Sequence, residues 1–529
     1  MESLWRFVIV LNLLVITCGK EIRISINGTE AIYNIDKKSP SVTLGMGIFK
    51  YGVIKYMNNT KLLTLAKALG PSYVRMGGTK SDHSHFVPGN IASEIREQNC
   101  LGKMPNNEEF VQHMLKVAEW QFENSFAKER YGLSDNNVSY TGSEFDDLMS
   151  LVNCANWELI FGLNLLDRKH GNKEWNSTNT VQLLNYAKSQ KHRVNWELGN
   201  EPNSYHHHTG FSVTPREIAT AFFQLNKILK SDSWWKQSKI IGPDANTMFK
   251  TSSLKFFKKV VHYMGSILNA VTFHQYYVDS RVATIFNFTD PALLNELLPQ
   301  LKHVKEIVNR QSPDLPVWIG ETSSSYGGGA KGLSDTYVAG FMWLDKLGLS
   351  ASNGIDIVFR QTLVEGNYAL LDDNFDPRPD YWLTLLYKTL VGTQVLNVTK
   401  TVIGAISKQH TKVRIYAHCT NTERTTYPTG SVTLYYLNLS TSRKKLSFVQ
   451  QSEQNLTIAV TYILTSTPGV LNSSDIYLNN KKLRMVDIHT MPTFNPRQVN
   501  IGAGKKINLP PSSFGFIVLK DSKIKACLK

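Results

Sequence analysis

Two glutamates in this sequence could act together as a catalytic pair. Glu201 ends the run Trp196-Glu-Leu-Gly-Asn-Glu and precedes Pro202, and Glu321 ends the run Trp318-Ile-Gly-Glu. Glycoside hydrolysis needs one protonated carboxyl to donate to the leaving oxygen and one ionised carboxylate to attack the anomeric carbon. Each residue alone is equally well interpreted as a surface glutamate where a loop begins. Two of them after similar apolar runs favour the catalytic interpretation, and a separation of about 5–5.5 Å between their carboxyls would indicate retention of configuration.

Short apolar runs recur along the first 360 residues, with sequence of helical character between them. This alternation predicts an α/β fold, a closed (β/α)8 barrel over residues 41–392. Residues at the carboxyl ends of barrel strands carry the chemistry, so Glu201 and Glu321, after the fourth and seventh strands, would face each other across the mouth. An open doubly wound sheet is the alternative, although no G-x-G-x-x-G follows the first strand. The eight runs begin near residues 41, 72, 159, 194, 239, 270, 316 and 355.

Two further parts flank the barrel. After about Val395 the pattern changes to alternating strands separated by turn residues, which predicts a C-terminal β-sandwich over residues 393–529. The alternating run Ile22–Ile26, within residues 20–40, could add a strand to it. The interval between the second and third barrel strands is about twice as long as the others, which indicates an inserted, linker-like segment at about residues 87–128.

The composition is typical of a folded protein, and the N-terminal residues predict secretion. Hydrophobic residues make up 42% of the 529 residues and charged residues 19%, which suits a buried core. Arg6 precedes the apolar run Phe7–Thr17, so residues 1–19 read as a cleavable signal peptide. An N-terminal anchor is the alternative, but this run is shorter than the roughly 20 residues that span a bilayer. We expect an extracellular or lysosomal location.

The net charge of +15 favours an anionic partner. A secreted protein would not meet nuclear or cytosolic nucleic acid, so we expect a glycosaminoglycan or extracellular phospholipid instead. Asn-x-Ser/Thr sequons support the secretory route, although some would occur by chance. They are Asn27, Asn58, Asn137, Asn176, Asn287, Asn397, Asn438, Asn455 and Asn472.

Four cysteines remain after removal of a signal peptide, an even count that suits two disulfides in an oxidising compartment. A Cys100–Cys154 bridge would tie the inserted segment to the barrel, and Cys419 and Cys527 could staple the two ends of the sandwich. Free buried thiols are the other interpretation.

Three longer motifs make the sequence resemble heparanases over nearly the whole chain: W-E-L-G-N-E-P-N-S, W-I-G-E-T-S-S-S-Y-G-G-G and F-M-W-L-D-K-L-G-L-S. The resemblance implies a barrel plus sandwich and a retaining endo-β-glucuronidase that acts on heparan sulfate without a cofactor. By match to the motifs, Glu201 resembles the acid/base and Glu321 the nucleophile. Asn200 resembles the residue that hydrogen-bonds the sugar 2-hydroxyl. The cysteine pairing above is also similar to that of the family.

Other positions that the resemblance places in the sugar-binding cleft are Thr79, His274, Tyr276, Arg281, Tyr326, Gly327, Gly328, Gln361, Gly366 and Tyr368. Backbone amides of Gly327 and Gly328 could approach a uronate carboxylate closely, because neither residue has a Cβ. A structural histidine or a packed tyrosine is the plain alternative for His274 and for the tyrosines. Basic residues that could contact an anionic polymer include Lys128, Arg130, Lys250, Lys255, Lys258 and Lys259.

The sequence departs from the family where substrate sulfates are expected to bind. The loop after the fifth strand, residues 244–250, lacks an arginine pair and offers only Lys250. Three histidines, His206–His208, stand where the family has lysines; they form a solvated loop more readily than a metal site, because no spaced ligand accompanies them. Gly45 and Gly47 replace an Asp and an Asn of the family, so one set of sugar contacts is expected to be missing.

Three functions therefore compete. The first is an endo-β-glucuronidase of heparan sulfate. The second keeps the mechanism but cleaves hyaluronan, which carries glucuronate without sulfate, as relatives in this family do. The third is a non-catalytic heparan sulfate binder, against which the two glutamates argue. The resemblance also implies removal of the inserted segment to give a two-chain form, although an active single chain is an alternative, and association with cell-surface proteoglycans is expected.

Overall fold

The computed structural model describes residues 21–89, 100, 102, 109–117, 136–169, 173–403, 412–449 and 456–528. The predicted signal peptide, the cations Lys128 and Arg130 and the sequon at Asn455 lie outside these residues. Within them, no helix has the length and apolar character needed to cross a membrane.

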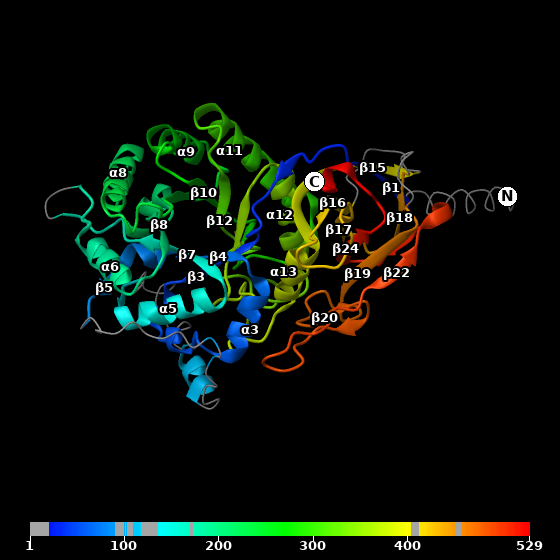
Figure 1. The fold of residues 1–529 in the computed structure, drawn as a ribbon, viewed down its shortest axis with the longest axis horizontal. Coiled ribbons are helices and arrows are strands. Elements are labelled where there is room, and N and C mark those ends of the chain that lie inside the picture. The colour runs from blue at the N-terminus through cyan, green and yellow to red at the C-terminus, as the bar shows by residue number, and fades with distance from the viewer. Residues whose placement is uncertain are drawn as a thin grey trace, which may run out of the picture.

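Eight parallel strands form a nearly closed barrel, which confirms the predicted fold class (Figure 1). Hydrogen-bonded neighbours follow the order β8-β7-β4-β3-β14-β12-β10-β9. The remaining seam between β8 and β9 is bridged at Trp196 and Ile240, where the Trp196 N–H donates to the Lys239 carbonyl at 2.9 Å. The strands are β3 (Ser41–Gly45), β4 (Ser72–Gly77), β7 (Trp157–Leu163), β8 (Val194–Leu198), β9 (Ile241–Ala245), β10 (Ala270–Gln275), β12 (Val317–Thr322) and β14 (Ile357–Arg360).

One long helix follows each barrel strand. Local sequence explains where several of them begin: Pro215 starts one helix behind a capping box of Thr214 and Glu217, and Thr141 with Glu144 caps another. The helices are α3 (Thr60–Leu69), α5 (Gly142–Cys154), α6 (Thr178–Ser189), α8 (Pro215–Ser231), α9 (Thr251–Met264), α11 (Leu297–Gln311), α12 (Ala339–Ser352) and α13 (Pro379–Leu390).

The barrel interior is layered. A buried apolar cluster drawn from six of the strands includes Tyr73, Trp318 and Phe359, with ring centroids of Tyr73 and Trp318 5.4 Å apart. Side chains alternate along a strand, so Arg75, two residues after Tyr73, points to the same interior one layer nearer the carboxyl ends. The polar site described below therefore stands on an apolar floor.

The second part of the chain is one twelve-stranded mixed sheet. β1 lies between β15, with which it pairs antiparallel, and β18, with which it pairs parallel, so the alternating N-terminal run does add a strand here. Apolar side chains from both halves of the sheet, such as Ile24, Leu446 and Ile517, share one core, as in a sandwich. The strands are β1 (Glu21–Asn27), β2 (Tyr33–Asn34), β15 (Val391–Ile403), β16 (Val413–Thr420), β17 (Val432–Asn438), β18 (Lys444–Phe448), β19 (Ile458–Ser466), β20 (Ile476–Leu478), β21 (Lys481–Lys482), β22 (Arg497–Asn500), β23 (Ile507–Leu509) and β24 (Ser513–Leu519).

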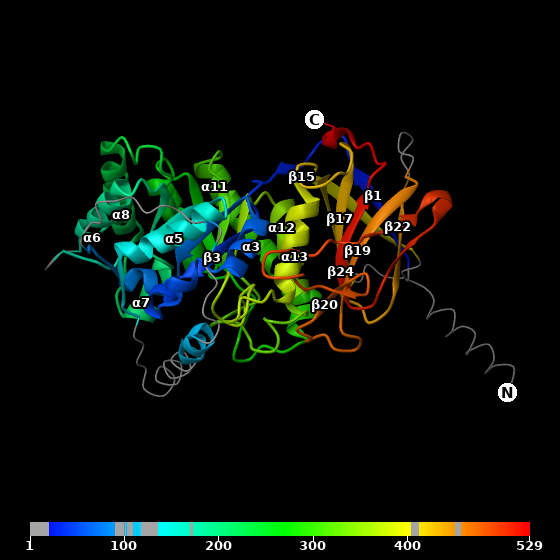
Figure 2. The ribbon, with the colours of Figure 1, turned by 60° about the horizontal axis from the view of Figure 1, so that its bottom comes forward.

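Helices α12 and α13 lie between the barrel and the second sheet (Figures 1 and 2). Residues 339–351 of α12 are all buried. Its Asp345 accepts a hydrogen bond from the Tyr416 hydroxyl at 2.6 Å and pairs with Arg414 at 3.1 Å, both from β16. A charged contact thus crosses the interface between the barrel and the second sheet.

The described pieces of the inserted segment attach to the barrel. Residues 109–117 are helical, and Phe110 contacts the rings of Tyr56 and Phe375 with centroids 4.9 and 5.0 Å apart. The segment leaves from β5 (Ser84–Val87) and returns at β6 (Val138–Thr141), which pair in parallel. The structure contains the disulfides Cys100–Cys154 and Cys419–Cys527.

One predicted glycosylation position does not suit this fold. Asn438 is fully buried, and its Nδ2 donates to the carbonyls of Ser442, Leu509 and Pro510. This nitrogen has no room for a glycan, so that prediction is corrected. The sequons with an exposed asparagine are Asn27, Asn137, Asn397 and Asn472, whereas Asn58, Asn176 and Asn287 are partly buried.

Candidate active site

Glu201 lies at the carboxyl end of β8, at the turn into a short 3-10 helix, Pro202–Ser204. Its backbone is left-handed, with φ 52°, which is unusual for a residue other than glycine and is a feature of functional sites. Pro202 starts the helix, and the Glu201 N–H donates to the Asp244 carbonyl at 2.9 Å. The side chain is 17% exposed and can therefore meet a substrate.

Glu321 lies in β12, three strands away around the barrel, and two donors hold its carboxylate. The Tyr276 hydroxyl donates to Oε1 at 2.6 Å, and Arg75 Nη1 donates to Oε2 at 3.0 Å. Each oxygen of the carboxylate therefore accepts a hydrogen bond, and the one from Arg75 comes from a charged donor. The side chain of Glu321 is 12% exposed, so one face remains open toward the mouth of the barrel.

Arg75 connects the two glutamate-bearing strands from inside the barrel. Its guanidinium, 1% exposed, also donates to Glu197 Oε2 at 2.7 Å and to Asn200 Oδ1 at 3.0 Å. Burial disfavours the charged form, but the carboxylates of Asp244, Glu197 and Glu321 outweigh burial and raise the pKa of Arg75. The guanidinium is a permanent cation that fixes the positions of residues from three strands.

His274 joins Glu201 to the same network. Its Nδ1 lies 2.9 Å from Glu201 Oε1, and its Nε2 lies 3.1 Å from Asp244 Oδ1. Burial alone would lower the pKa of His274, but the charge of Glu321 and the bonds to Asp244 and Glu201 raise it to about 10. The imidazolium is therefore charged at neutral pH, and both candidate catalytic carboxylates act on it.

Asp244 supplies the balancing negative charge at the bottom of this network. Burial opposes its ionisation, but Arg75 and His274 hold the pKa of Asp244 below its usual range. Gly320 leaves the space that this carboxylate occupies, because a Cβ at that position would lie 2.6 Å from Asp244 Oδ1. The ion pairs are thus built into the strand packing.

Hydrogen bonds to its backbone and to its side chain hold Asn200 in position. Its backbone N–H donates to Asp82 Oδ2 at 2.8 Å, while its side-chain oxygen accepts from Arg75. Asp82 also accepts from the Leu165 N–H at 3.1 Å, and burial raises the pKa of Asp82 to about 7 against these bonds. The contacts with Asp82 and Arg75 fix the orientation of the Asn200 side-chain amide, including its Nδ2 donor.

Comparison with known proteins agrees with this geometry. Residues 120–348 match glycosyl hydrolase family 79, N-terminal domain. The chain is 37% identical over 485 residues to the heparanase of Bos taurus, a match that covers 89% of this chain and 86% of the bovine protein. The chain belongs to the heparanase family of glycoside hydrolases.

Other relatives in the heparanase family have names that state different activities. Inactive heparanase-2 of Homo sapiens is 32% identical over 538 residues, 96% of this chain and 89% of that protein. Hyaluronoglucuronidase of Hirudo nipponia is 31% identical over 533 residues, 96% of this chain and 100% of that protein. A solved 4-O-α-L-rhamnosyl-β-D-glucuronidase from Fusarium oxysporum has a TM-score of 0.62 at 15% identity, covering 94% of this chain and 100% of that one; this likeness concerns the fold.

The other residues that the heparanase resemblance places in the cleft fall into two groups. Near the glutamates, Tyr368 packs on Tyr276 with ring centroids 6.4 Å apart, and the Thr43 hydroxyl donates to the Gln361 side chain. The loop of Gly327 and Gly328 meets the loop of Gly366, where the Asn367 N–H donates to the Gly328 carbonyl at 2.8 Å. A Cβ on Gly328 would meet no atom within 4 Å, so its backbone is accessible.

The second group lies further out. Thr79 is exposed just beyond the carboxyl end of β4, and Tyr326 is 50% exposed. The guanidinium of Arg281, 81% exposed, binds Asp279 through Nη2 at 2.6 Å and Nε at 3.0 Å, which offsets part of its charge. Lys250 is exposed at the start of α9, and Lys255, Lys258 and Lys259 follow on the exposed face of that helix.

Among the described residues, no group of three or more histidine, cysteine, aspartate or glutamate side chains is placed to hold a metal ion. His206 and His207 are exposed on α7 (Tyr205–Thr209), as a solvated segment would be.

Sequence reasoning missed the charged layer of Arg75, Glu197, Asp82 and Asp244. Arg75, Glu197 and Asp244 are each the one charged residue of a buried strand, as in Ser72-Tyr-Val-Arg-Met-Gly, and Asp82 lies in the 3-10 helix that follows β4. A charge within a strand that is otherwise apolar requires a buried partner, and that was the available signal. The partner of Arg75 could not be identified from the sequence, because Arg75 and Glu321 are 246 residues apart.

Proposed function

We propose that this chain is a secreted, retaining endo-β-glucuronidase that hydrolyses internal glucuronosyl linkages of heparan sulfate. One observation carries the proposal: Glu201 and Glu321, at the ends of β8 and β12, are held by one buried network of Arg75, His274 and Asp244. A pair of carboxyls at a barrel mouth is what glycoside hydrolysis requires.

The contacts assign different roles to the two glutamates. Glu321 accepts bonds from Arg75 and Tyr276, which suits an ionised nucleophile. Glu321 would attack the anomeric carbon and form a glycosyl ester as the bond to the leaving oxygen breaks. Glu201 would give its proton to that oxygen, so that a neutral hydroxyl departs.

The second step reverses these proton movements. Glu201, now ionised, would take a proton from a water molecule, and the resulting hydroxide equivalent would attack the anomeric carbon and release Glu321. Two inversions give net retention. Asn200, fixed by Arg75 and Asp82, is positioned to bind a sugar hydroxyl, a bond that strengthens as positive charge develops on the sugar ring.

Hyaluronan is the second candidate substrate, and a specific observation favours it. The carboxyl group of Glu365 occupies the space that Gly45 and Gly47 leave at the carboxyl end of the first barrel strand. A carboxyl group at this wall offers no positive charge to a sulfate and suits a polymer without sulfate. A hyaluronoglucuronidase is among the relatives of similar length.

Secretion, a lysosomal location and removal of the inserted segment belong to the same proposal. Residues 1–19 support a signal peptide, and exposed asparagines such as Asn137 and Asn472 can accept glycans. The net charge of +15 supports contact with polyanions, including cell-surface proteoglycans.

Product sizing tests the proposed activity. Purified protein is incubated at mildly acidic pH with heparan sulfate and, separately, with hyaluronan, and fragment lengths are measured. We expect shortened chains from the wild type and none from Glu321→Gln, because an amide neither ionises nor attacks. Retained polymer binding by Glu321→Gln shows that the fold is intact.

Each outcome has a distinct meaning. Shortened heparan sulfate supports the first substrate and shortened hyaluronan alone the second. Full activity of Glu321→Gln would contradict the assignment of the nucleophile. Binding without cleavage by the wild type would instead favour a non-catalytic binder.

A further inference from the structure

Glu365 stands at the mouth of the barrel and belongs to none of the contacts described for Glu201 and Glu321. It lies in the loop after β14, the eighth barrel strand, which neighbours the first strand, β3. Its φ of 71° is in the left-handed region, and Gly366 follows with φ 83°. Glutamate is disfavoured in this region, which marks the turn as a constrained one.

This loop also forms the wall beside the candidate nucleophile. A Cβ on Gly366 would lie 3.1 Å from the Gly328 carbonyl oxygen and 3.2 Å from the Tyr368 ring. That ring packs on Tyr276, whose hydroxyl donates to Glu321. Glu365 therefore precedes Tyr368, one of the two rings of this wall, by three residues along the chain.

The carboxyl group of Glu365 fills the space that two glycines leave. A Cβ on Gly47 would lie 2.6 Å from Oε1, and a Cβ on Gly45 would lie 3.2 Å from Oε2. Any larger side chain at position 47 would displace this carboxyl. One glutamate from the loop of the eighth strand thus fills the space beside two glycines at the end of the first strand.

The carboxyl is not satisfied by the protein. Oε1 is shielded from solvent and has no hydrogen-bond partner in the described part of the chain. Burial raises the pKa of Glu365 to about 8, although Lys80 opposes this effect. At acidic and neutral pH the group therefore carries a proton and can both donate and accept a hydrogen bond.

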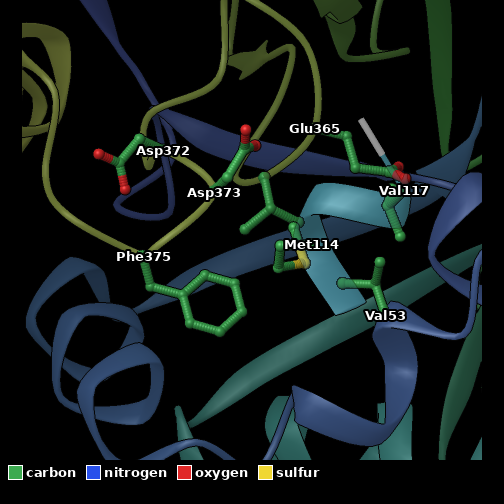
Figure 3. A pocket seen from close by; sticks show the side chains of 8 residues that line it. Val53, Met114, Val117, Glu365, Asp372, Asp373 and Phe375 are labelled. Atoms are coloured by element: carbon green, nitrogen blue, oxygen red, sulfur yellow. The ribbon is translucent and has the colours of Figure 1, made fainter. Parts of the chain in front are cut away.

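The surroundings of Glu365 combine two further carboxyl groups with apolar side chains, and the charge of Lys80 also acts on Glu365. Glu365, Asp372 and Asp373 line a pocket together with Phe375 of the barrel and with Met114 and Val117 of the inserted segment (Figure 3). A sulfate here would find no compensating charge from a protonated Glu365 and repulsion from an ionised one. An uncharged acetamido or hydroxyl group meets neither difficulty.

We propose that Glu365 is a specificity-determining residue of the cleft, which selects sugars that present an uncharged acetamido or hydroxyl group at this wall over sugars that present a sulfate. The inference rests on the proposed glucuronidase activity and narrows its substrates to glucuronate polymers that are unsulfated at the sugar contacting Gly45, Gly47 and Glu365. Heparosan, the unsulfated polymer with the heparan backbone, and hyaluronan share this chemistry.

The test compares kcat/KM on heparosan, hyaluronan and heparan sulfate at mildly acidic pH. Glu365→Lys places a cation at the wall and should raise the ratio of heparan sulfate to heparosan cleavage about tenfold. Glu365→Gln keeps a neutral donor and acceptor and should retain the wild-type ratio. Both keep the Cβ, so backbone strain at position 365 is matched.

Asp373→Lys is the control for a general field effect, because it also places a cation in the same pocket, but away from the two glycines. We expect less than about a twofold change in the ratio. An equal change in Asp373→Lys, or no change in Glu365→Lys, would overturn the inference. The relative rates on heparosan and hyaluronan then show which linkage the cleft accepts.

A second pair covers the case in which Glu365→Lys does not fold. Glu365→Leu fits the apolar side of the pocket but cannot hydrogen-bond, so its KM on the unsulfated polymer should rise about tenfold relative to Glu365→Gln. Equal KM values would show that the carboxyl has only a structural role. If the wild type cleaves none of the three polymers, the proposed function itself fails, whereas cleavage with unchanged specificity rejects only the role of Glu365.

Discussion

Among single residues, Tyr276 offers the sharpest test of the proposed mechanism. Its hydroxyl donates to Glu321 at 2.6 Å, and Arg75 holds the other oxygen. Tyr276→Phe removes one donor and leaves the packing of the ring. We expect kcat to fall about 100-fold with little change in KM, because a bond that orients the nucleophile matters most in the transition state.

Tyr277→Phe is a matched control at the next position. Tyr277 is buried, and its hydroxyl has no hydrogen-bond partner in the described residues. We expect wild-type steady-state kinetics from this variant. Equal losses in both variants would indicate a packing effect and would contradict the assigned role of Tyr276.

The site shows what could be predicted from single residues and what could not. Glu201 and Glu321 were visible because each ends an apolar run at the place where barrel enzymes hold their chemistry. Glu365 was hidden, because its significance depends on the missing side chains of Gly45 and Gly47, more than 300 residues earlier in the chain. The roles of the two glutamates in catalysis stay predictions until the variants are measured.

Among the elements, the helical segment 109–117 makes the clearest prediction. Phe110 is 5% exposed and contacts Tyr56 and Phe375. Phe110→Ala would leave a cavity at this contact and should weaken the docking of the segment by about 3 kcal/mol. Amide hydrogen exchange of residues 109–117 should then become markedly faster, and proteolysis of the segment more rapid.

Leu115→Ala is the control in the same segment, because Leu115 is 59% exposed. We expect its exchange and proteolysis to match the wild type. Unchanged exchange in Phe110→Ala would mean that the ring contacts do not hold the segment in place. The result bears directly on whether removal of the inserted segment requires it to detach from the barrel.

The strands were the elements that sequence predicted best. All eight barrel strands overlap the apolar runs, because strands buried on both faces carry nearly continuous apolar sequence. The second sheet was predicted by its alternation. The single curled sheet with a parallel β1–β18 pair was not predictable, since residues 21–24 and 445–448 meet only after the chain folds.

At the scale of the whole molecule, Asp345 ties stability to pH across the interface between the barrel and the second sheet. Burial raises the pKa of Asp345 to about 6, against the attraction of Arg414. The stability contributed by its protonated form is complete below an ordinary pKa near 4 and is lost as the pH rises through about 6. From pH 4 to pH 8, the wild type should therefore lose about 3 kcal/mol relative to Asp345→Asn, which cannot ionise.

Urea unfolding of both proteins at several pH values measures this difference. Ser350→Ala, a change at another buried position of α12, should show a difference from the wild type that does not vary with pH. Parallel pH profiles of the wild type and Asp345→Asn would show that the carboxyl does not titrate in this range.

Helix α12 has no side that faces water: one face covers the barrel and the other covers the sheet. A chain that ended after the barrel would expose the apolar face of α12 to solvent, and we expect such a chain to aggregate. The same holds for a sheet expressed alone. The barrel and the second sheet therefore depend on each other for a stable fold. A smaller enzyme made from the barrel alone would first need polar side chains on the face of α12 that now covers the sheet.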